Sequence, residues 1–418
     1  MRVLIIPIGS RGDVFPFISL GRALKERGHQ VTFLTGERFK HVADEFGFDF
    51  EPIHDADFER PSFSAESRPM SMAKRFVDSV MVELMRSGVP RIRRHVEKGR
   101  TVMLAAPQAI PARIVRELDG VPLITTCLSP LYFRSSHRNR TLPGVWSPDR
   151  LPKWAKRVTF ALEDRLSDRY LGGDVAKFRQ ELGLPPTTGL MTRWWFSPDG
   201  VMNLFPEWFA HPQPDWPSPM WWTGFVLQDS SSRPVDDEVW RFLDAGAPPV
   251  VFTLSSWMRQ SDVFFRESIE ACRKLGLRAV LLSKSDDPVP NPLPADVAHF
   301  GFVPHRELLP RCAAIVHPGG IGTVAHSLAA GLPQVIVPAV FDQPDNAVHL
   351  GRLGVARTVL PARYRSDLVA ETLRDLLEKK ETSERFSQIR QWCADAPGTK
   401  QTVETVEKIA EAAGVEST

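Results

Sequence analysis

The sequence predicts an α/β protein made of two Rossmann-like, doubly wound domains. Two observations lead to this class. Short apolar runs alternate with helical patterns from residue 2 onward, and the same alternation restarts after residue 234. Continuous apolar runs are typical of parallel strands that are buried on both faces. The length of 418 residues also suits two domains.

The first βαβ unit occupies the opening 35 residues. The run 2–8 is expected to be a strand, Pro16 to lie in the first turn of a helix, and Gly28 to end that helix before a strand at 31–35. The alternation continues with a short helix over 37–46 and strands around 48–53, 101–106 and 122–127.

The stretch 184–222 differs from its surroundings because it holds six of the eleven tryptophans and eight prolines. Proline interrupts regular helix, so we expect an irregular connection between the domains that ends near Pro234. The second domain then follows, with expected strands at 249–254, 279–283, 314–317 and 334–338 and helices at 261–275 and from 322.

The last helix, 399–413, places Val403, Val406, Ile409 and Ala413 on one face, which predicts that it packs against another surface. The expected organisation is therefore an N-terminal acceptor-binding domain (1–215), a linker (216–234), a C-terminal nucleotide-sugar-binding domain (235–395) and a C-terminal helix (396–418) that packs back towards the first domain.

Composition excludes several classes of protein. Lys+Arg 52 against Asp+Glu 50 gives a net charge of +2, which does not suit a general nucleic-acid binder. The four cysteines are scattered singly, so neither a zinc site nor a disulfide framework is expected. No apolar run is long enough for a spanning helix or a secretory signal. We therefore expect a reduced, cytoplasmic protein.

The densest candidate site is the segment His317-Pro-Gly-Gly-Ile-Gly-Thr323, directly after a predicted strand. Gly319, Gly320 and Gly322 allow a tight turn and a close approach of the backbone to a ligand. The helix that follows would direct its free N–H groups at the turn, which suits a phosphate group. His317 and Thr323 add side-chain donors. The alternative is a glycine-rich turn with a structural histidine.

A second candidate is Phe341-Asp-Gln-Pro-Asp-Asn346, after the next predicted strand. Asp342 and Gln343 would lie at the carboxyl end of the sheet, where open α/β sheets bind ligands. A carboxylate beside an amide suits hydrogen bonding to vicinal sugar hydroxyls. The alternative is that Asp342 or Asp345 simply caps a helix.

These two segments resemble the donor-binding signature of the family 1 glycosyltransferases, which have the GT-B fold of two domains facing across a cleft. Gly301-Phe-Val-Pro-His305 resembles the segment of that family that packs on the nucleobase, with Phe302 in place of Trp and His305 in place of Gln. The resemblance implies that Phe302 and Val303 contact the base. Leu254-Ser-Ser256 resembles a turn near the phosphates, which makes Ser256 a candidate phosphate ligand.

Asp13 is the candidate catalytic residue, in the loop after the first strand. Glycosyl transfer to a hydroxyl needs a base that takes the acceptor proton, and bacterial members with Gly-Ser-x-Gly-Asp resemble this chain there. Helix capping is the alternative role. The resemblance implies a single displacement with inversion and no metal or other cofactor, the donor being a dTDP- or UDP-hexose. Epimerase, non-catalytic partner and NAD-linked oxidoreductase are the competing classes.

The acceptor side is indicated by apolar segments. Within the family, the blocks at 8–17, 197–201 and 204–219 resemble the rhamnosyltransferase subunits of rhamnolipid synthesis, which implies rhamnose or glucose transfer to a small hydrophobic or lipid-like acceptor. Met81, Met85, Trp194 and Trp195 are the candidate pocket residues, with core packing as the alternative. Basic stretches with Trp146 and Trp154 suit peripheral contact with the inner face of a membrane, or a solvated loop.

Overall fold

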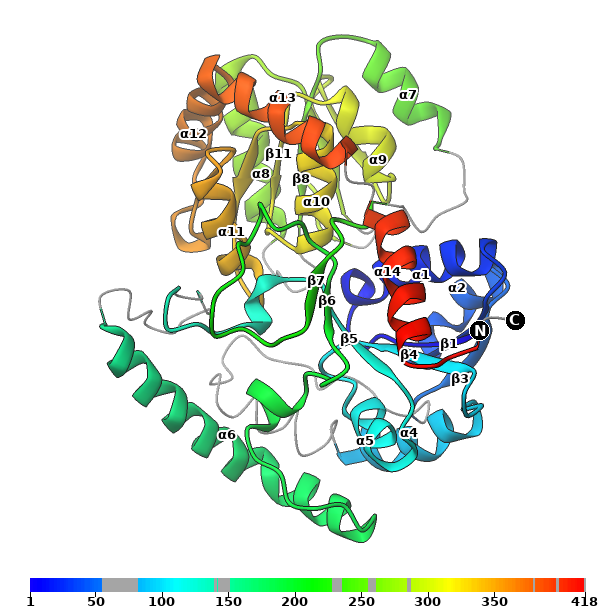
Figure 1. The fold of residues 1–418 in the computed structure, drawn as a ribbon. Helices are drawn as coiled ribbons and strands as arrows, with labels where there is room; N and C mark the ends of the chain where they lie inside the picture. Colours follow the sequence, from blue (N-terminus) through cyan, green and yellow to red (C-terminus); the bar gives the residue numbers. More distant parts are fainter. Residues whose placement is uncertain are drawn as a thin grey trace.

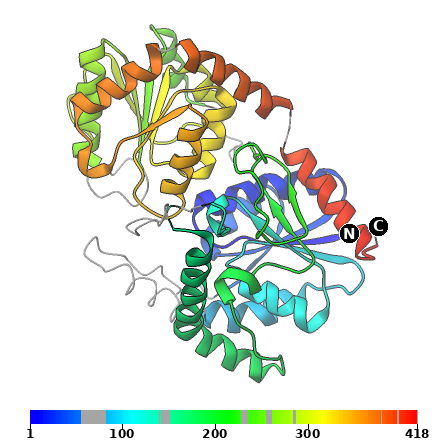
Figure 2. The same cartoon turned by 60° about the vertical axis from the view of Figure 1, so that its left-hand side comes forward.

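The structure is a computed structural model, described for residues 1–54, 82–138, 141, 151–227, 235–254, 261–283, 287–378, 380–395 and 398–416. It consists of two parallel sheets, each covered by helices, in two domains that meet near the middle of the molecule (Figures 1 and 2). This confirms the predicted α/β class with two Rossmann-like domains.

The first sheet has seven parallel strands in the order β3-β2-β1-β4-β5-β6-β7. Arg2 of β1 pairs with Gln30 on one side and Thr101 on the other, so the first strand is central. The strands are β1 (Arg2–Ile6), β2 (Gln30–Thr35), β3 (Asp49–Pro52), β4 (Thr101–Ala105), β5 (Leu123–Cys127), β6 (Val201–Asn203) and β7 (Met220–Trp222).

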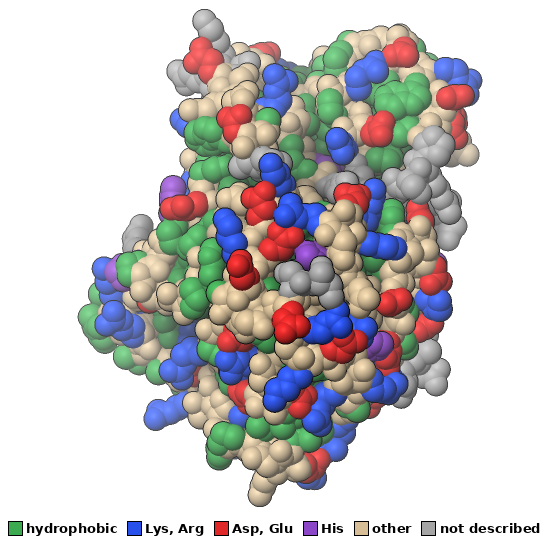
Figure 3. Space-filling view, turned by 45° about the vertical axis from the view of Figure 1, so that its right-hand side comes forward, with side chains coloured by type: hydrophobic (Ala, Val, Ile, Leu, Met, Phe, Trp, Pro, Cys, Tyr) green, Lys and Arg blue, Asp and Glu red, His purple; other side chains and the backbone are tan. Residues whose placement is uncertain are grey.

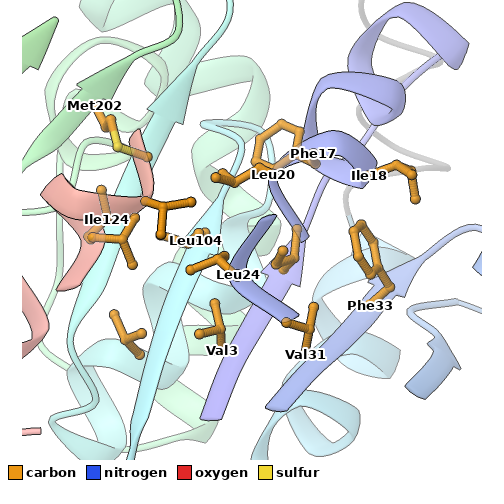
Figure 4. Packing of buried hydrophobic residues seen from close by; sticks show 14 of the residues in the cluster. Val3, Phe17, Ile18, Leu20, Leu24, Val31, Phe33, Leu104, Ile124 and Met202 are labelled. Atoms are coloured by element: carbon orange, nitrogen blue, oxygen red, sulfur yellow. The ribbon is translucent and has the colours of Figure 1, made fainter. Parts of the chain in front are cut away.

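Helices on both faces bury this sheet. Phe17, Leu20 and Leu24 of α1 pack on Val3 and Leu104 of the central strands, and all five are fully buried (Figure 4). The helices of this domain are α1 (Arg11–Glu26), α2 (Lys40–Glu45), α4 (Val82–Arg94), α5 (Ile110–Asp119) and α6 (Lys153–Glu181), with short turns at η1 (Glu37–Phe39), η3 (Pro130–Tyr132) and η4 (Leu190–Trp194).

The second sheet has six parallel strands in the order β10-β9-β8-β11-β12-β13. They are β8 (Val250–Thr253), β9 (Ala279–Leu282), β10 (Val297–Phe300), β11 (Ala314–His317), β12 (Gln334–Ile336) and β13 (Ala356–Thr358). The helices are α7 (Asp237–Asp244), α8 (Ser261–Leu275), α9 (His305–Leu308), α10 (Ile321–Ala330), α11 (Gln343–Arg352), α12 (Ser366–Glu378) and α13 (Lys380–Asp395), with turns η5 (Leu309–Arg311) and η6 (Pro361–Arg363).

The last helix, α14 (Gly398–Ala412), leaves the second domain and lies against α1 of the first (Figure 1). Val403 and Val406 are buried there in the core of the first domain. Glu407 accepts hydrogen bonds from Arg27 at 2.7 and 2.8 Å and contacts His29 at 2.9 Å. No described helix is both long and apolar enough to cross a membrane.

Two expectations need correction. Helix α1 begins at Arg11, so Pro16 lies inside the helix, in its second turn and not in its first. The proline- and tryptophan-rich stretch 184–222 is part of the first domain and contributes its last two strands, β6 and β7. β7 lies inside the predicted linker 216–234, so the linker begins later. Both strands have three residues, too few for a periodic pattern to be visible in the sequence.

Candidate active site

Asp13 lies in the first turn of α1, just beyond the carboxyl end of β1. Its Oδ2 accepts hydrogen bonds from the backbone N–H of Ser10 at 2.5 Å and from the Ser10 hydroxyl at 2.7 Å. Ser10 is the N-cap residue of the helix. Asp13 therefore takes part in the cap, but only through Oδ2, and no hydrogen bond reaches Oδ1 from the described residues.

The glycine-rich segment forms the loop between β11 and α10. Gly319 has φ of +97°, and a Cβ there would lie 2.7 Å from Ile336 Cγ2, so no other residue fits without movement. Gly320 is the N-cap residue of α10 and offers no capping side chain. The first-turn N–H groups of Ile321, Gly322 and Thr323 are therefore available to an anion, with the helix dipole in the favourable direction.

His317 is fully buried behind this loop. Its Nδ1 accepts a hydrogen bond from the Gly319 N–H at 3.1 Å, so its Nε2 donates to Gln334 Oε1 at 3.0 Å. Burial lowers the pKa of His317 to about 4, so the ring is neutral near pH 7. Both ring nitrogens thus bind protein groups. This differs from the expected phosphate contact and gives His317 the role of holding the loop.

The second motif opens α11, after β12. Asp342 occupies the N-cap position without capping the helix, and its Oδ2 instead accepts from Asn346 Nδ2 at 2.8 Å. The same Nδ2 donates to the Gly319 carbonyl at 2.9 Å, which joins the two motifs. Phe341 has φ of +54°, a strained value for a bulky side chain, and strain of this kind is common at functional sites.

Gln343 is buried and folds back on its own loop. Its Oε1 accepts from the N–H groups of Ala339 and Val340 at 2.9 and 3.0 Å. Its Nε2 makes no hydrogen bond with the described residues. The side chain is thus held in place by one end and can donate with the other.

Electrostatics shows that Asp13 and Asp342 lie near each other although they belong to different domains. Burial and then the negative charge of Asp13 raise the pKa of Asp342 to about 7, against the effect of the Asn346 hydrogen bond. Burial and the charges of Asp13 and Asp342 also raise the pKa of Tyr132 well above its usual value. Asp13 of the first domain and Asp342 of the second therefore lie close enough to Tyr132 for their charges to affect its pKa.

Sequence reasoning missed Tyr132, its neighbour Gln108, and Asn346. Gln108 Nε2 donates to the Tyr132 hydroxyl at 2.5 Å, and Gln108 Oε1 is buried with no partner among the described groups. Tyr132 follows the carboxyl end of β5, the position at which such sheets bind ligands, so the signal was present. Asn346 was one helical turn from Asp342 in a motif already singled out.

The nucleobase candidates are placed differently from each other. Phe302 is 62% exposed, a large apolar ring with no protein surface over most of its area. Val303 is 2% exposed and packs in the core of the second domain with Leu308 and Leu309. A base stacked here would meet the Phe302 ring, whereas the buried Val303 has almost no surface to offer, which differs from the expected contact with the base.

The acceptor candidates are separated by the fold. Met85 and Trp194 belong to the core between the first sheet and α4 and α5, and Trp194 Nε1 donates to Glu117 at 2.9 Å. Packing of the first domain thus accounts for both. Trp195 instead faces the Tyr132 ring, edge-on at 5.8 Å between centroids. Met81 and Ser256 lie outside the described residues.

A buried ion pair joins the domains beside the site. Asp345 is fully buried and binds Arg138 Nη2 and the Thr141 N–H, both at 2.9 Å. Burial would raise the pKa of Asp345, but the contacts with His349 and Arg138 hold it below the usual value. The pair therefore ties the loop after η3 to α11, the helix that carries Asp342. We call this contact the Arg138–Asp345 latch.

Two family models match parts of the chain. The Glycosyltransferase family 28 N-terminal domain matches residues 3–137, and the Erythromycin biosynthesis protein CIII-like C-terminal domain matches residues 279–409. The chain is 27% identical to O-mycaminosyltylonolide 6-deoxyallosyltransferase of Streptomyces fradiae, over 98% of both chains. It is 30% identical to the glycosyltransferase GtfC of Amycolatopsis orientalis, over 85% of both. The solved calicheamicin glycosyltransferase CalG4 matches with a TM-score of 0.74 at 16% identity, over 98% of both chains.

Two Rossmann-like domains with a glycine-rich helix start and an acidic motif at their junction define a nucleotide-sugar-dependent glycosyltransferase of the GT-B fold. The chain belongs to the glycosyltransferases of the family 1 and family 28 type, and is related to antibiotic sugar transferases and sterol glucosyltransferases. The enzyme prediction is confirmed, and the competing epimerase, oxidoreductase and non-catalytic classes are set aside.

Proposed function

We propose that this enzyme transfers a hexose from a dTDP- or UDP-sugar to a hydroxyl of a small hydrophobic or lipid-like acceptor, with inversion and without a metal. The observation that carries the proposal is the meeting of Asp13 and Asp342 across the domain junction, beside the uncapped start of α10. One domain then supplies the base and the other supplies the donor site.

In this reaction the acceptor hydroxyl loses its proton to Asp13 Oδ1 as its oxygen bonds to the anomeric carbon. The bond from that carbon to the β-phosphate oxygen breaks on the opposite face, and the nucleoside diphosphate leaves with the electron pair. Its growing negative charge is stabilised by the N–H groups of Gly320, Ile321, Gly322 and Thr323, which are positioned before the reaction starts.

Asp342 and Gln343 are the proposed ligands of the donor sugar. A carboxyl group whose pKa lies near 7 exchanges between accepting and donating hydrogen bonds close to neutral pH. The fixed Gln343 amide offers its Nε2 to an adjacent hydroxyl. Phe302 is the proposed stacking surface for the base, and its exposure supports that role.

For the donor nucleotide we favour dTDP. A relative 28% identical over 86% of this chain is named dTDP-epi-vancosaminyltransferase, and a solved structure of similar fold, VinC, contains dTDP. For the acceptor, two relatives are named for the molecule that they glycosylate, the vancomycin aglycone and a sterol, and the sterol is a largely apolar alcohol. The resemblance to rhamnolipid synthesis adds rhamnose as donor sugar and a lipid-like acceptor.

Thermal unfolding with dTDP and with UDP, each with and without EDTA, tests the donor half of the proposal. A ligand at 100 times its dissociation constant stabilises the folded state by about 2.7 kcal/mol, a shift of several degrees in a protein of this size. A shift with dTDP that EDTA leaves unchanged is expected. The absence of a shift with both nucleotides would contradict the proposed donor site.

A further inference from the structure

The helix α6 carries a row of large apolar side chains that face solvent. Trp154, Val158, Leu162 and Leu166 are 70%, 62%, 57% and 42% exposed, and their four-residue spacing puts them on one face of the helix. They account for four of the nine large hydrophobic side chains exposed in the described part of the chain. We call this row the apolar ladder. A contiguous apolar surface of this kind marks an interaction site.

A row of basic side chains runs beside the ladder. Lys153, Arg157, Arg165 and Arg169 are exposed, and none of them forms an ion pair or hydrogen bond with another described residue. Arg157 and Arg165 directly precede Val158 and Leu166. The outward face of α6 thus combines apolar and positively charged side chains along about 18 Å of helix from Trp154 to Leu166.

Two acidic residues of the same helix, Asp164 and Asp168, point towards the protein, whereas Glu163 is 44% exposed and Asp174 and Glu181 are exposed further along the helix. Asp164 accepts from Arg134 Nη2 at 2.6 Å and from the Thr192 hydroxyl at 2.6 Å. Asp168 accepts from the N–H groups of Gly189 and Leu190 at 2.8 and 3.1 Å. Figure 3 shows charges of both signs interspersed on one face of the molecule. Between Trp154 and Leu166 of α6, Arg157 and Arg165 are exposed and unpaired with any described residue, while the half-exposed Glu163 is paired with Arg134.

We propose that α6 docks on an anionic lipid bilayer, with the apolar ladder inserted at the interface and the basic row on the headgroups. Figure 1 shows α6 along the outer edge of the first domain, where a flat surface can reach it. Apolar side chains that include Trp, with Lys and Arg beside them, are typical of helices that lie in the plane of a membrane. A second copy of the chain fits less well, because pairing two ladders would bring two basic rows together.

Docking would also bring the lipid close to the acceptor side of the site, and this part rests on the proposed function. Arg134 lies two residues after Tyr132 in the chain. It stacks on Phe160 of α6 at 4.9 Å and binds Asp164 of the same helix. The segment that carries Tyr132 and leads to the Arg138–Asp345 latch is thus anchored on the inner face of α6. An acceptor dissolved in the bilayer would reach the enzyme from this side.

Vesicle sedimentation tests the proposal directly. The full chain is mixed with vesicles of phosphatidylcholine alone or with added phosphatidylglycerol, at low and at high salt. We expect binding only with the anionic lipid, weakened by salt. Leu162→Ser should lower the partition coefficient about tenfold. The double variant Arg157→Glu, Arg165→Glu should lower it at least about 25-fold, since each basic side chain contributes about fivefold.

Matched controls lie on the second domain. Leu360 is 54% exposed, and Arg374 is also exposed. The variants Leu360→Ser and Arg374→Glu should leave vesicle binding unchanged. Absence of binding to anionic vesicles, or equal losses in ladder and control variants, would overturn the proposal. Recovery of an acidic protein by α6 without any lipid binding would also overturn it. Nucleotide-induced thermal shifts in the same variants separate this outcome from failure of the donor site.

Discussion

At the scale of single residues, the two oxygens of Asp13 have different surroundings. Oδ2 accepts both hydrogen bonds from Ser10, and Oδ1, which accepts none from the described residues, is the proposed base. We expect Asp13→Asn to lower kcat by a factor of 10² or more, because the amide cannot take a proton. Its oxygen can still accept from Ser10, so the melting temperature and the dTDP affinity should change little. Parallel loss of turnover and nucleotide affinity would refute the base assignment.

Asp342 supplies a prediction about pH. Its pKa is about 7 in the folded protein and lower when unfolded, so the folded state holds the proton more tightly. The free energy of unfolding therefore falls as the pH rises from about 4 to about 7. Asn at position 342 does not titrate, so Asp342→Asn does not lose stability in this way. The variant should melt a few degrees above the wild type at pH 8, with a smaller difference at pH 5. Equal differences at both pH values would contradict the raised pKa.

At the scale of elements, the glycines of the loop before α10 have unequal reasons to be glycine. Gly319 combines φ of +97° with a contact to Ile336, whereas a Cβ at Gly322 would meet nothing within 4 Å. Gly319→Ala should destabilise the free protein by about 1–3 kcal/mol. Gly322→Ala should be neutral or raise stability by up to about 1 kcal/mol, since it lies in a helix.

Nucleotide binding separates the two substitutions further. If the diphosphate rests on the first turn of α10, Gly322→Ala crowds its approach and weakens dTDP binding without loss of stability. Calorimetric titration of the folded variant measures this directly. Unchanged affinity would move the phosphate site away from Gly322.

At the scale of the whole molecule, the two domains are joined by packing contacts as well as by the linker. One apolar cluster contains Phe133 and Phe205 of the first domain together with Leu328 and Leu350 of the second. The Arg138–Asp345 latch and the docking of α14 on α1 add polar and helical contacts. We therefore expect the domains to unfold together in a single thermal transition.

Arg138→Ala tests the latch, because it leaves the charge of a fully buried Asp345 without its cation. Loss of one partner from a buried pair costs about 3–5 kcal/mol, so the melting temperature should fall by several degrees. Arg311→Ala, which breaks the exposed pair with Asp244, is the control and should cost less than about 1 kcal/mol. Similar losses in both variants, measured by differential scanning calorimetry, would argue against a structural latch.

The sequence by itself determined the two α/β domains and the position of the donor motifs, because both depend on local signals. Buried parallel strands such as 314–317 read as apolar runs, and Gly319 after His317 marks a turn that needs a glycine. The three-residue strands β6 and β7 escaped prediction because their pairing, and not their own pattern, makes them strands.

Only the tertiary structure decided which groups meet. Asp13 and Asp342 are more than 300 positions apart, and Tyr132 comes from a third segment, so no local pattern relates them. No local pattern shows the partners of His317 and Trp194 either. His317 Nε2 donates a hydrogen bond to Gln334, and Trp194 Nε1 donates one to Glu117. Burial fixes these partners, since a buried polar group must find a hydrogen bond in the folded chain, and the sequence does not show where that partner will lie.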